Sequence, residues 1–351
     1  MSVDPLAPAA AADFLAALQR MGLLRADDPV PVVTPLAGGV SSDIVRVDLA
    51  HGPVCVKRAL PKLKVKADWQ APVERNRWEV EWMRTAAGVE PRAVPEMLGE
   101  DAAAGMFAMA YLDEASHPVW KALLRDGVID PGFAAEVGHR IASIHAATAG
   151  NPDVQARFQT DHIFFPIRLE PYLVATGRAH PDLAAQLEGL AQRTGATHLA
   201  LVHGDVSPKN ILRGPHGPVF LDAECAWYGD PAFDLAFCLN HTLLKCLWRP
   251  QWSGQYLDCF DALTRAYLER VTWEPRATID ARTAALLPGL FLARVDGKSP
   301  AEYVTQDWQR EAVRRVARPL LQRPPARLAE VVTAWRTDIE GWNRNIVTRG
   351  S

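Results

Sequence analysis

The sequence predicts an α+β protein with two lobes, a smaller β-rich lobe followed by a larger helical lobe. The chain has 351 residues, which exceeds the usual size of one hydrophobic core. Its first third alternates apolar residues with turn residues, whereas long helical patterns dominate from residue 113 onward. We therefore expect an N-terminal lobe over 1–112, a C-terminal lobe over 113–351 and a cleft between them.

The first thirty residues predict a leading helix. The stretch MSVDPLAPAAAADFLAALQR is rich in alanine but opens with an acid rather than a basic segment. Its apolar run is also interrupted by Asp13, which is unlike the apolar centre of a signal peptide. We interpret residues 1–30 as part of the folded N-terminal lobe.

Consecutive β-strands are predicted next. Val45 and Val47 alternate with other residues in one run, Val54 and Val56 do so in the next, and a His-Gly pair stands at the turn between them. Residues 93–114 predict two more strands around an Ala-Gly turn. A small antiparallel sheet therefore starts the fold.

Helices are predicted from apolar spacing. Residues 74–87 carry Trp78 and Trp82 four positions apart, and we expect this helix to end before Gly88. Residues 131–150 form a strongly amphipathic pattern, and the chain from about 230 to 345 is helical with proline breaks. Between them, 200–212 and 219–222 are short apolar runs around a turn.

Composition excludes several classes of function. Charged residues make up 23% and hydrophobic residues 48%, so the chain is expected to fold rather than stay disordered. The net charge of -3 offers no basic field for nucleic acid or an anionic membrane. The longest apolar run, 283–293, is too short for a membrane span, and five cysteines without a C-x-x-C pair favour a reducing cytoplasm.

The residues that carry chemistry lie between His203 and Glu224. Asp205 and Asn210 are five residues apart in a charged loop, and Asp222 ends a strand after a short hairpin. Phosphoryl transfer needs a carboxylate that orients the attacking hydroxyl and oxygen ligands that hold Mg²⁺ against nucleotide phosphates. The alternative is a turn residue, a cap and a strand-end acid, which are ordinary places for Asp and Asn.

The motif H-G-D-x-x-x-x-N-I-L followed by L-D-x-E resembles the catalytic core of the aminoglycoside phosphotransferase and choline kinase superfamily, whose fold is similar to that of protein kinases. Protein kinases have arginine in place of Gly204 and lysine in place of Ser207. The resemblance therefore implies a protein-kinase-like bilobal fold and a small-molecule kinase that uses ATP and Mg²⁺.

The same resemblance implies a role for each residue of the motif. Asp205 is implied as the catalytic base, and Asn210 and Asp222 as Mg²⁺ ligands. Glu224 completes D-x-E, as in methylthioribose kinases and choline kinases, where this glutamate lies near the second metal. Asp234 is implied as a buried acid that supports the catalytic loop.

Lys57 is the candidate for contacting the α and β phosphates, because it ends a strand of the N-terminal lobe. Glu79, 22 residues later on the predicted helix, is its expected partner and matches the family pattern E-x-x-x-L/M. Glu81 is the rival, but it lies about 200° around the helix from Glu79, so only one of them can face the cleft.

Two backbone segments complete the candidate nucleotide site. Gly38 and Gly39 allow close approach of the backbone to phosphates, and Ser41 or Ser42 can donate hydrogen bonds. A Gly-Gly pair is otherwise just a turn. Residues 109–112 resemble the hinge that meets adenine through backbone groups, and Ala110 and Leu112 would supply those groups.

The acceptor is predicted to be a small hydroxylated metabolite, a sugar or an amino alcohol. Residues 230–351 carry 17 Lys and Arg against 14 Asp and Glu, a balance of +3 that disfavours a polycationic aminoglycoside. Arg294 resembles the arginine with which methylthioribose kinases contact substrate. Trp227 could belong to an aromatic cage for a quaternary ammonium, but core packing is the favoured interpretation of its position.

Two other functions remain as alternatives. One is inactivation of an aminoglycoside antibiotic by phosphorylation. The other is a non-catalytic nucleotide-binding module, which usually lacks the base or a metal ligand. Because this chain keeps Lys57, Asp205, Asn210 and Asp222, catalysis is the favoured hypothesis.

Overall fold

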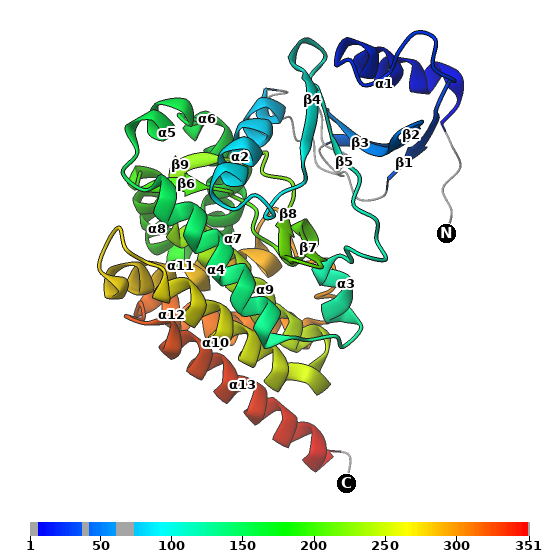
Figure 1. The fold of residues 1–351 in the computed structure, drawn as a ribbon. Helices are drawn as coiled ribbons and strands as arrows, with labels where there is room; N and C mark the ends of the chain where they lie inside the picture. The colour runs from blue at the N-terminus through cyan, green and yellow to red at the C-terminus, as the bar shows by residue number, and fades with distance from the viewer. Residues whose placement is uncertain (1–5, 37–41, 61–73, 350–351) are drawn as a thin grey trace.

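The computed structural model describes residues 6–36, 42–60 and 74–349 of the chain, with side chains as far as residue 341. A five-stranded antiparallel sheet stands beside a larger helical body (Figure 1). The sheet has the order β1-β2-β3-β5-β4, with bounds β1 Val32–Pro35, β2 Ser42–Leu49, β3 Gly52–Ala59, β4 Met97–Asp101 and β5 Met106–Ala110. The predicted α+β arrangement of a β-rich part followed by a helical part is confirmed.

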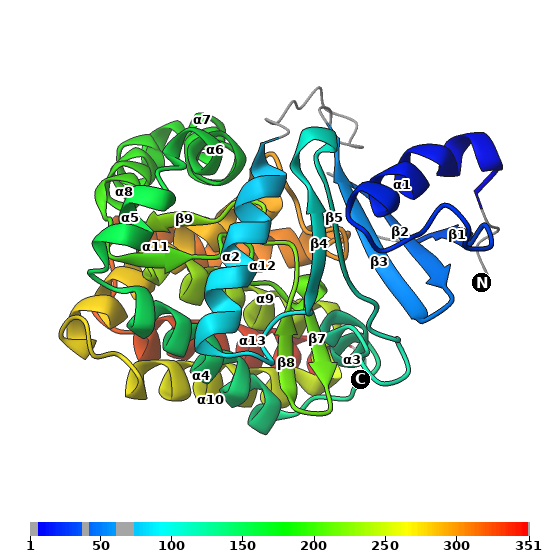
Figure 2. The same cartoon turned by 45° about the horizontal axis from the view of Figure 1, so that its top comes forward.

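Two helices cover the two faces of this sheet (Figure 2). Helix α1 (Pro8–Arg20) packs on the face that carries Val47 and Val56, and helix α2 (Arg75–Val89) packs on the face that carries Cys55. Because side chains alternate along a strand, Lys57 shares the α2 face with Cys55. Helix α1 is shorter than the expected range 1–30.

Helix α2 runs past its expected end. We expected it to stop before Gly88, but the structure continues it to Val89. Gly88 lies inside the last turn of α2 rather than capping it. A Cβ at this position would have no atom within 4 Å outside the helix backbone, so packing does not require a glycine here. Glycine is only mildly unfavourable within a helix, at about 1 kcal/mol relative to alanine, and packing of Trp82 and Met83 against the core offsets that cost.

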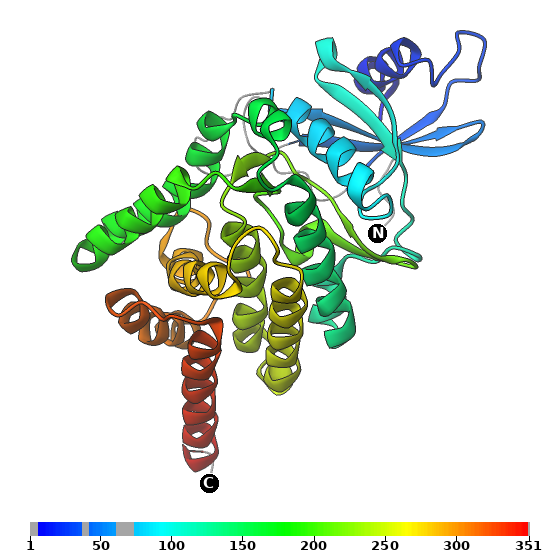
Figure 3. The ribbon, with the colours of Figure 1, turned by 60° about the vertical axis from the view of Figure 1, so that its left-hand side comes forward.

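The helical body contains most of the core (Figures 1 and 3). Helix α9 runs through its centre, with α10 and α11 packed against it. The described helices are α3 Trp120–Arg125, α4 Pro131–Thr148, α5 Pro152–Arg157, α6 Asp161–Phe164, the π-helical η2 Phe165–Val174, α7 Ala175–Ala179, α8 Ala184–Ala196, α9 Ala232–Trp248, α10 Ser253–Glu269, α11 Arg276–Asp296, α12 Asp307–Gln322 and α13 Leu328–Arg349.

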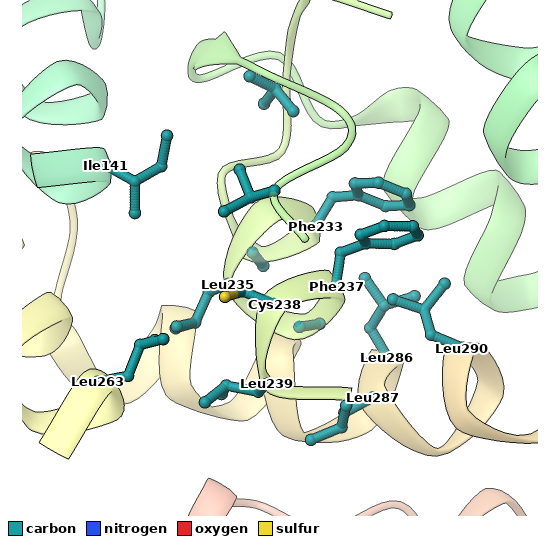
Figure 4. Close-up of a cluster of buried hydrophobic side chains, with 14 of the residues drawn as sticks. Ile141, Phe233, Leu235, Phe237, Cys238, Leu239, Leu263, Leu286, Leu287 and Leu290 are labelled. Carbon is teal, nitrogen blue, oxygen red and sulfur yellow. The ribbon is translucent and has the colours of Figure 1, made fainter. Parts of the chain in front are cut away.

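Helix α9 is buried on all sides. Figure 4 shows Phe233 and Phe237 stacked on one side of it, near Leu286 and Leu290 of α11, while Leu235 points toward the opposite side. Every residue from 232 to 247 is buried. A helix that is enclosed on every side has to bury its polar residues too, and this becomes important for the site.

Two small two-stranded sheets follow helix α8 in the chain. Strand β6 (Ala200–Val202) pairs with β9 (Trp227–Gly229), and β7 (Ile211–Gly214) pairs with β8 (Gly217–Phe220). The short turn η4 (Pro208–Asn210) precedes β7. The β6–β9 pair flanks the motif found in the sequence at both ends, and the β7–β8 hairpin lies within it. Among the described residues, no helix is long and apolar enough to cross a membrane.

Candidate active site

The loop between β6 and η4 requires a glycine. Gly204 has φ +80°, and a Cβ placed there would lie 2.7 Å from the carbonyl oxygen of Cys225. Any other residue would therefore meet both backbone strain and a steric clash. This explains in physical terms why Gly204 stands where protein kinases have arginine.

Asp234 fastens the same loop from the first turn of α9. Its two carboxylate oxygens accept hydrogen bonds from the backbone N–H groups of His203 and Gly204 at 2.7 and 2.8 Å. Asp234 is fully buried and also contacts His145, whose other ring nitrogen meets the hydroxyl of Tyr267. The loop is thus fixed to the helical core, which is the arrangement that the family resemblance implies for this acid.

Asp205 lies next to this anchor and is held by two cations. Its Oδ2 is 3.0 Å from a guanidinium nitrogen of Arg168 and 3.1 Å from the ammonium of Lys209. Burial on its own would raise the pKa of Asp205, but Lys209 and Arg168 outweigh that effect and the pKa is lowered. Asp205 is therefore ionised at neutral pH and can accept a hydrogen bond from a hydroxyl.

Asn210 lies between Asp205 and the chain segment that carries Asp222. The amide nitrogen of Asn210 donates to the carbonyl oxygen of Asp205 at 3.2 Å, which leaves the amide oxygen as an acceptor. Its backbone carbonyl accepts from the N–H of Leu221, which places Asp222 beside it. Asp222 has φ +69°, a strained conformation that is typical of functional positions.

Lys57 joins the sheet to the helical body. Its ammonium lies 2.9 and 2.7 Å from the two oxygens of Glu79 on α2 and 2.5 Å from Oδ1 of Asp222. Burial lowers the pKa of Lys57, but Asp222 and Glu79 raise it by more, so the ammonium keeps its charge. The expected pair with Glu79 forms, while Glu81 faces outward and pairs with Arg84.

Glu224, expected as a metal ligand, is occupied by a different partner. Its Oε2 accepts from Nε of Arg75 at 2.9 Å, and Arg75 also donates to the carbonyl of Leu60. In the described parts of the chain, no cluster of three or more His, Cys, Asp or Glu could hold a metal. Two protein oxygens, from Asn210 and Asp222, still fit Mg²⁺, because this ion takes few protein ligands and completes its shell with phosphate and water.

The other nucleotide-site candidates are only partly brought together. Gly38, Gly39 and Ser41 lie outside the described residues. Ser42 starts β2, and its buried hydroxyl has no hydrogen-bond partner among the described residues, which makes it available to a ligand. In the hinge, the N–H of Ala110 donates to the carbonyl of Glu96 and is not free for adenine.

Leu112 is the expected hinge residue whose backbone groups are still available to adenine. It lies just beyond β5, and within the described residues neither its N–H nor its carbonyl bonds to another backbone group. Extended chain with free backbone groups is what recognition of an adenine edge requires. Of the two expected hinge residues, the structure leaves only Leu112 with such groups.

The two substrate candidates have different outcomes. Trp227 is buried in the core, where it stacks on Phe164 at 4.3 Å and donates from Nε1 to Asp161. Its place in an aromatic cage was therefore wrong, because no face of the ring is left for a ligand. Arg294 is mostly buried in the last turn of α11, where one guanidinium nitrogen donates to the hydroxyl of Tyr172 and to the carbonyl of Ser299.

Sequence reasoning missed Arg168 and Lys209, the two cations on Asp205. Lys209 stands inside the motif itself, so its position one residue before Asn210 could have suggested it. Arg168 lies in η2, where it also donates to the carbonyl of Gly204. A π-helical segment does not show the spacing of an α-helix, so no pattern pointed to it.

Residues 32–269 match the model of the phosphotransferase enzyme family, and the chain belongs to this family. Among curated proteins it is similar to methylthioribose kinase from Erwinia tasmaniensis, with 27% identity over 55% of this chain and 54% of that protein. It is also similar to methylthioribose kinase from Enterobacter sp., with 25% identity over 69% of each chain.

Among solved structures, the fold is similar to that of a choline/ethanolamine kinase family protein from Mesorhizobium loti. The TM-score is 0.53 and the sequence identity 17%, over 94% of this chain and 99% of that one. The chain spans about half the length of the first curated relatives that it matches. The family is thus shown by the sequence, and the kinase-like fold by the structure.

Proposed function

We propose that this protein is an ATP- and Mg²⁺-dependent O-phosphotransferase that acts on a hydroxyl group of a small metabolite. The observation that carries the proposal is the position of Lys57. This lysine contacts Glu79 and Asp222 at once, so the sheet and the helical body meet at one buried cation beside Asp205 and Asn210. These are the parts that phosphoryl transfer requires.

In the proposed reaction, the acceptor hydroxyl donates its hydrogen bond to Asp205. Its oxygen attacks the γ-phosphorus of ATP as the proton passes to Asp205, a new O–P bond forms, and the bond from the γ-phosphorus to the β-phosphate oxygen breaks. Lys57 contacts the phosphates and Asp222, which favours release of ADP as the leaving group. Bound Mg²⁺, held by Asn210 and Asp222, would neutralise charge on the phosphates.

Arg168 and Lys209 keep Asp205 ionised and fix its carboxylate. Because the pKa of Asp205 is lowered, it orients the hydroxyl more than it pulls on the proton. Such a mechanism suits a dissociative transition state, in which positioning matters more than deprotonation. The names of the curated relatives favour a sugar-like acceptor over an antibiotic.

We place the boundary between the nucleotide-binding lobe and the substrate-binding lobe between residues 112 and 113.

The test is a coupled ADP-release assay over a panel of sugars, amino alcohols and aminoglycosides. We expect turnover with at least one sugar or amino alcohol, and Asp205→Asn should lower kcat by about 10²–10⁴-fold. Asp182→Asn is the matched control, since Asp182 pairs with Arg318 on the surface. Equal rates in the Asp205 variant would mean that the base is wrong, and turnover of aminoglycosides alone would refute the acceptor class.

A further inference from the structure

One face of α9 continues from the catalytic loop into the helical body. It carries Phe237, His241 and Lys245 at intervals of four residues. Phe237 lies 5.8 Å from the guanidinium of Arg168, which holds Asp205, and its ring centroid is 5.7 Å from that of His241. A row of contacting side chains therefore leads from Asp205 along the helix to Lys245.

Lys245 ends this row as a buried cation. Only 1% of the residue is exposed, and its ammonium lies 4.9 Å from the ring centroid of Tyr303 and 5.5 Å from that of Trp248. Within the described residues it has no hydrogen-bond or ion-pair partner. Aromatic faces compensate a buried ammonium only in part, because they supply no acceptor for its three N–H groups.

Two more cations surround the same place. Arg294 is 8% exposed, and its Nε has no partner among the described residues. Lys121 lies 6.0 Å from the ring of Tyr303 and forms an ion pair with Glu302. Three cations thus lie near one carboxylate; Lys245 and Arg294 are buried, whereas Lys121 and Glu302 form an ion pair at the partly exposed edge.

We name Lys121, Lys245 and Arg294 the cationic cluster. Elsewhere basic side chains have acidic partners: on α12, for example, Arg314 pairs with Asp296 and Arg315 with Asp338. The cluster differs because its charges exceed the acid available. Buried cations without an anion are unfavourable, and they are retained where a ligand supplies the anion.

We propose that the cationic cluster binds an anionic group, a carboxylate or a phosphate, on the acceptor whose hydroxyl lies at Asp205. This inference rests on the function proposed above and narrows its acceptor class. Eight residues of helix separate Phe237 from Lys245, a rise of about 12 Å. Arg294 lies closer to the catalytic loop, because it donates to the hydroxyl of Tyr172, whose ring centroid is 5.4 Å from that of Phe237.

The titration of Lys245 supports this assignment. Burial, followed by the charge of Lys121, lowers the pKa of Lys245 from its ordinary value of 10.5 to about 7, and Arg294 lowers it further. Glu302 and the thiol of Cys238 act in the opposite direction but do not restore it. A bound anion would raise the pKa again, so anion binding and protonation of Lys245 favour each other.

The experiment compares matched acceptors that differ in charge. The pairs are D-gluconate with D-glucitol and ribose 5-phosphate with ribose, tested in the ADP-release assay on the wild type, Lys245→Met and Arg249→Met. Met keeps the length of the lysine side chain without its charge. Arg249 is the control, because its guanidinium also lies over the ring of Trp248, at 5.4 Å, but Arg249 does not belong to the cationic cluster.

We expect at least one anionic member to exceed its neutral partner in kcat/KM by about 10–100-fold. Lys245→Met should remove that preference by raising KM for the anionic compound, while Arg249→Met should keep it. Equal kcat/KM within both pairs, or a preference unchanged in Lys245→Met, would overturn the inference while leaving the proposed kinase activity intact.

Binding separates failure of this inference from failure of the kinase proposal. If no acceptor is phosphorylated, calorimetric titration of the same four compounds into the wild type and the two variants still tests whether the cationic cluster binds an anion. Tighter binding of an anionic compound than of its neutral partner, lost in Lys245→Met, would support the cationic cluster as an anion site without catalysis. Equal binding by all three proteins would refute it.

Discussion

Two buried lysines distinguish the two halves of the candidate site. Lys57 contacts two carboxylates, Glu79 and Asp222, whereas Lys245 contacts only aromatic rings and lies near other cations. Both are about equally buried. The environment around them differs, and with it the sign of the pKa shift: that of Lys57 is raised and that of Lys245 is lowered.

The difference teaches how each half is assembled. Around Lys57, which lies on β3, the opposite charges come from α2 and from the loop that follows β8, so the chain supplies its own compensation before any ligand binds. Around Lys245 the positive charge is only partly compensated, which lowers the free energy of unfolding, and a bound anion can restore it. Such a trade of stability for function is common at binding sites.

The largest effect is expected from breaking the compensated half. Lys57→Met leaves the buried carboxylate of Glu79 and the partly buried carboxylate of Asp222 side by side without their cation, which should lower the free energy of unfolding by about 3–5 kcal/mol. Guanidinium unfolding followed by circular dichroism measures it. Lys298→Met, which removes an exposed partner of Glu170, should change stability by less than about 1 kcal/mol. An equally small effect in Lys57→Met would contradict the comparison.

A smaller effect of opposite sign is expected from the uncompensated half. Lys245→Met should raise the free energy of unfolding by on the order of 3 kcal/mol near neutral pH, because it removes a buried charge that lacks an anion, less the lost contact with the aromatic rings. Arg249→Met should leave stability almost unchanged. A structural role for the Lys245 charge would instead make Lys245→Met less stable.

The gain from Lys245→Met should depend on pH. Below pH about 7 the lysine is protonated in both the folded and the unfolded chain, so the folded wild type bears the full cost of the buried charge. Between about 7 and 10.5 the unfolded chain binds more protons than the folded chain, so wild-type stability rises with pH. The advantage of the Met variant should therefore shrink between about pH 6 and about pH 9.

Most of the residues around Lys57 could be predicted from the sequence. Asp205, Asn210 and Asp222 lie within 18 residues of each other, in loops whose spacing alone can bring them to one point. Lys57 and Glu79 followed from the order of a strand and a helix, and from the fact that only one of two glutamates can face inward. Local patterns thus predicted residues that act through local geometry and short connections.

The residues around Lys245 could not be predicted from the sequence, for physical reasons. In a fully enclosed helix such as α9 there is no exposed polar face, so the four-residue spacing of His241 and Lys245 does not mark them as a site among the apolar residues around them. Arg168 was hidden by the irregular turn of η2. Trp227 was named as a substrate candidate because an aromatic residue beside a catalytic motif gives the same sequence pattern whether it lines a ligand site or packs in a core.

The most direct test of the central claim is calorimetric titration of AMP-PNP, with Mg²⁺ and with EDTA, into the wild type and Asp222→Asn. Asp222 contributes one of the two proposed Mg²⁺ ligands and the contact to Lys57. We predict that Mg²⁺ tightens binding of the nucleotide to the wild type and that this effect is lost in Asp222→Asn. The same Mg²⁺ effect in both proteins, or no binding to the wild type, would contradict the claim that this cluster is a metal–nucleotide site.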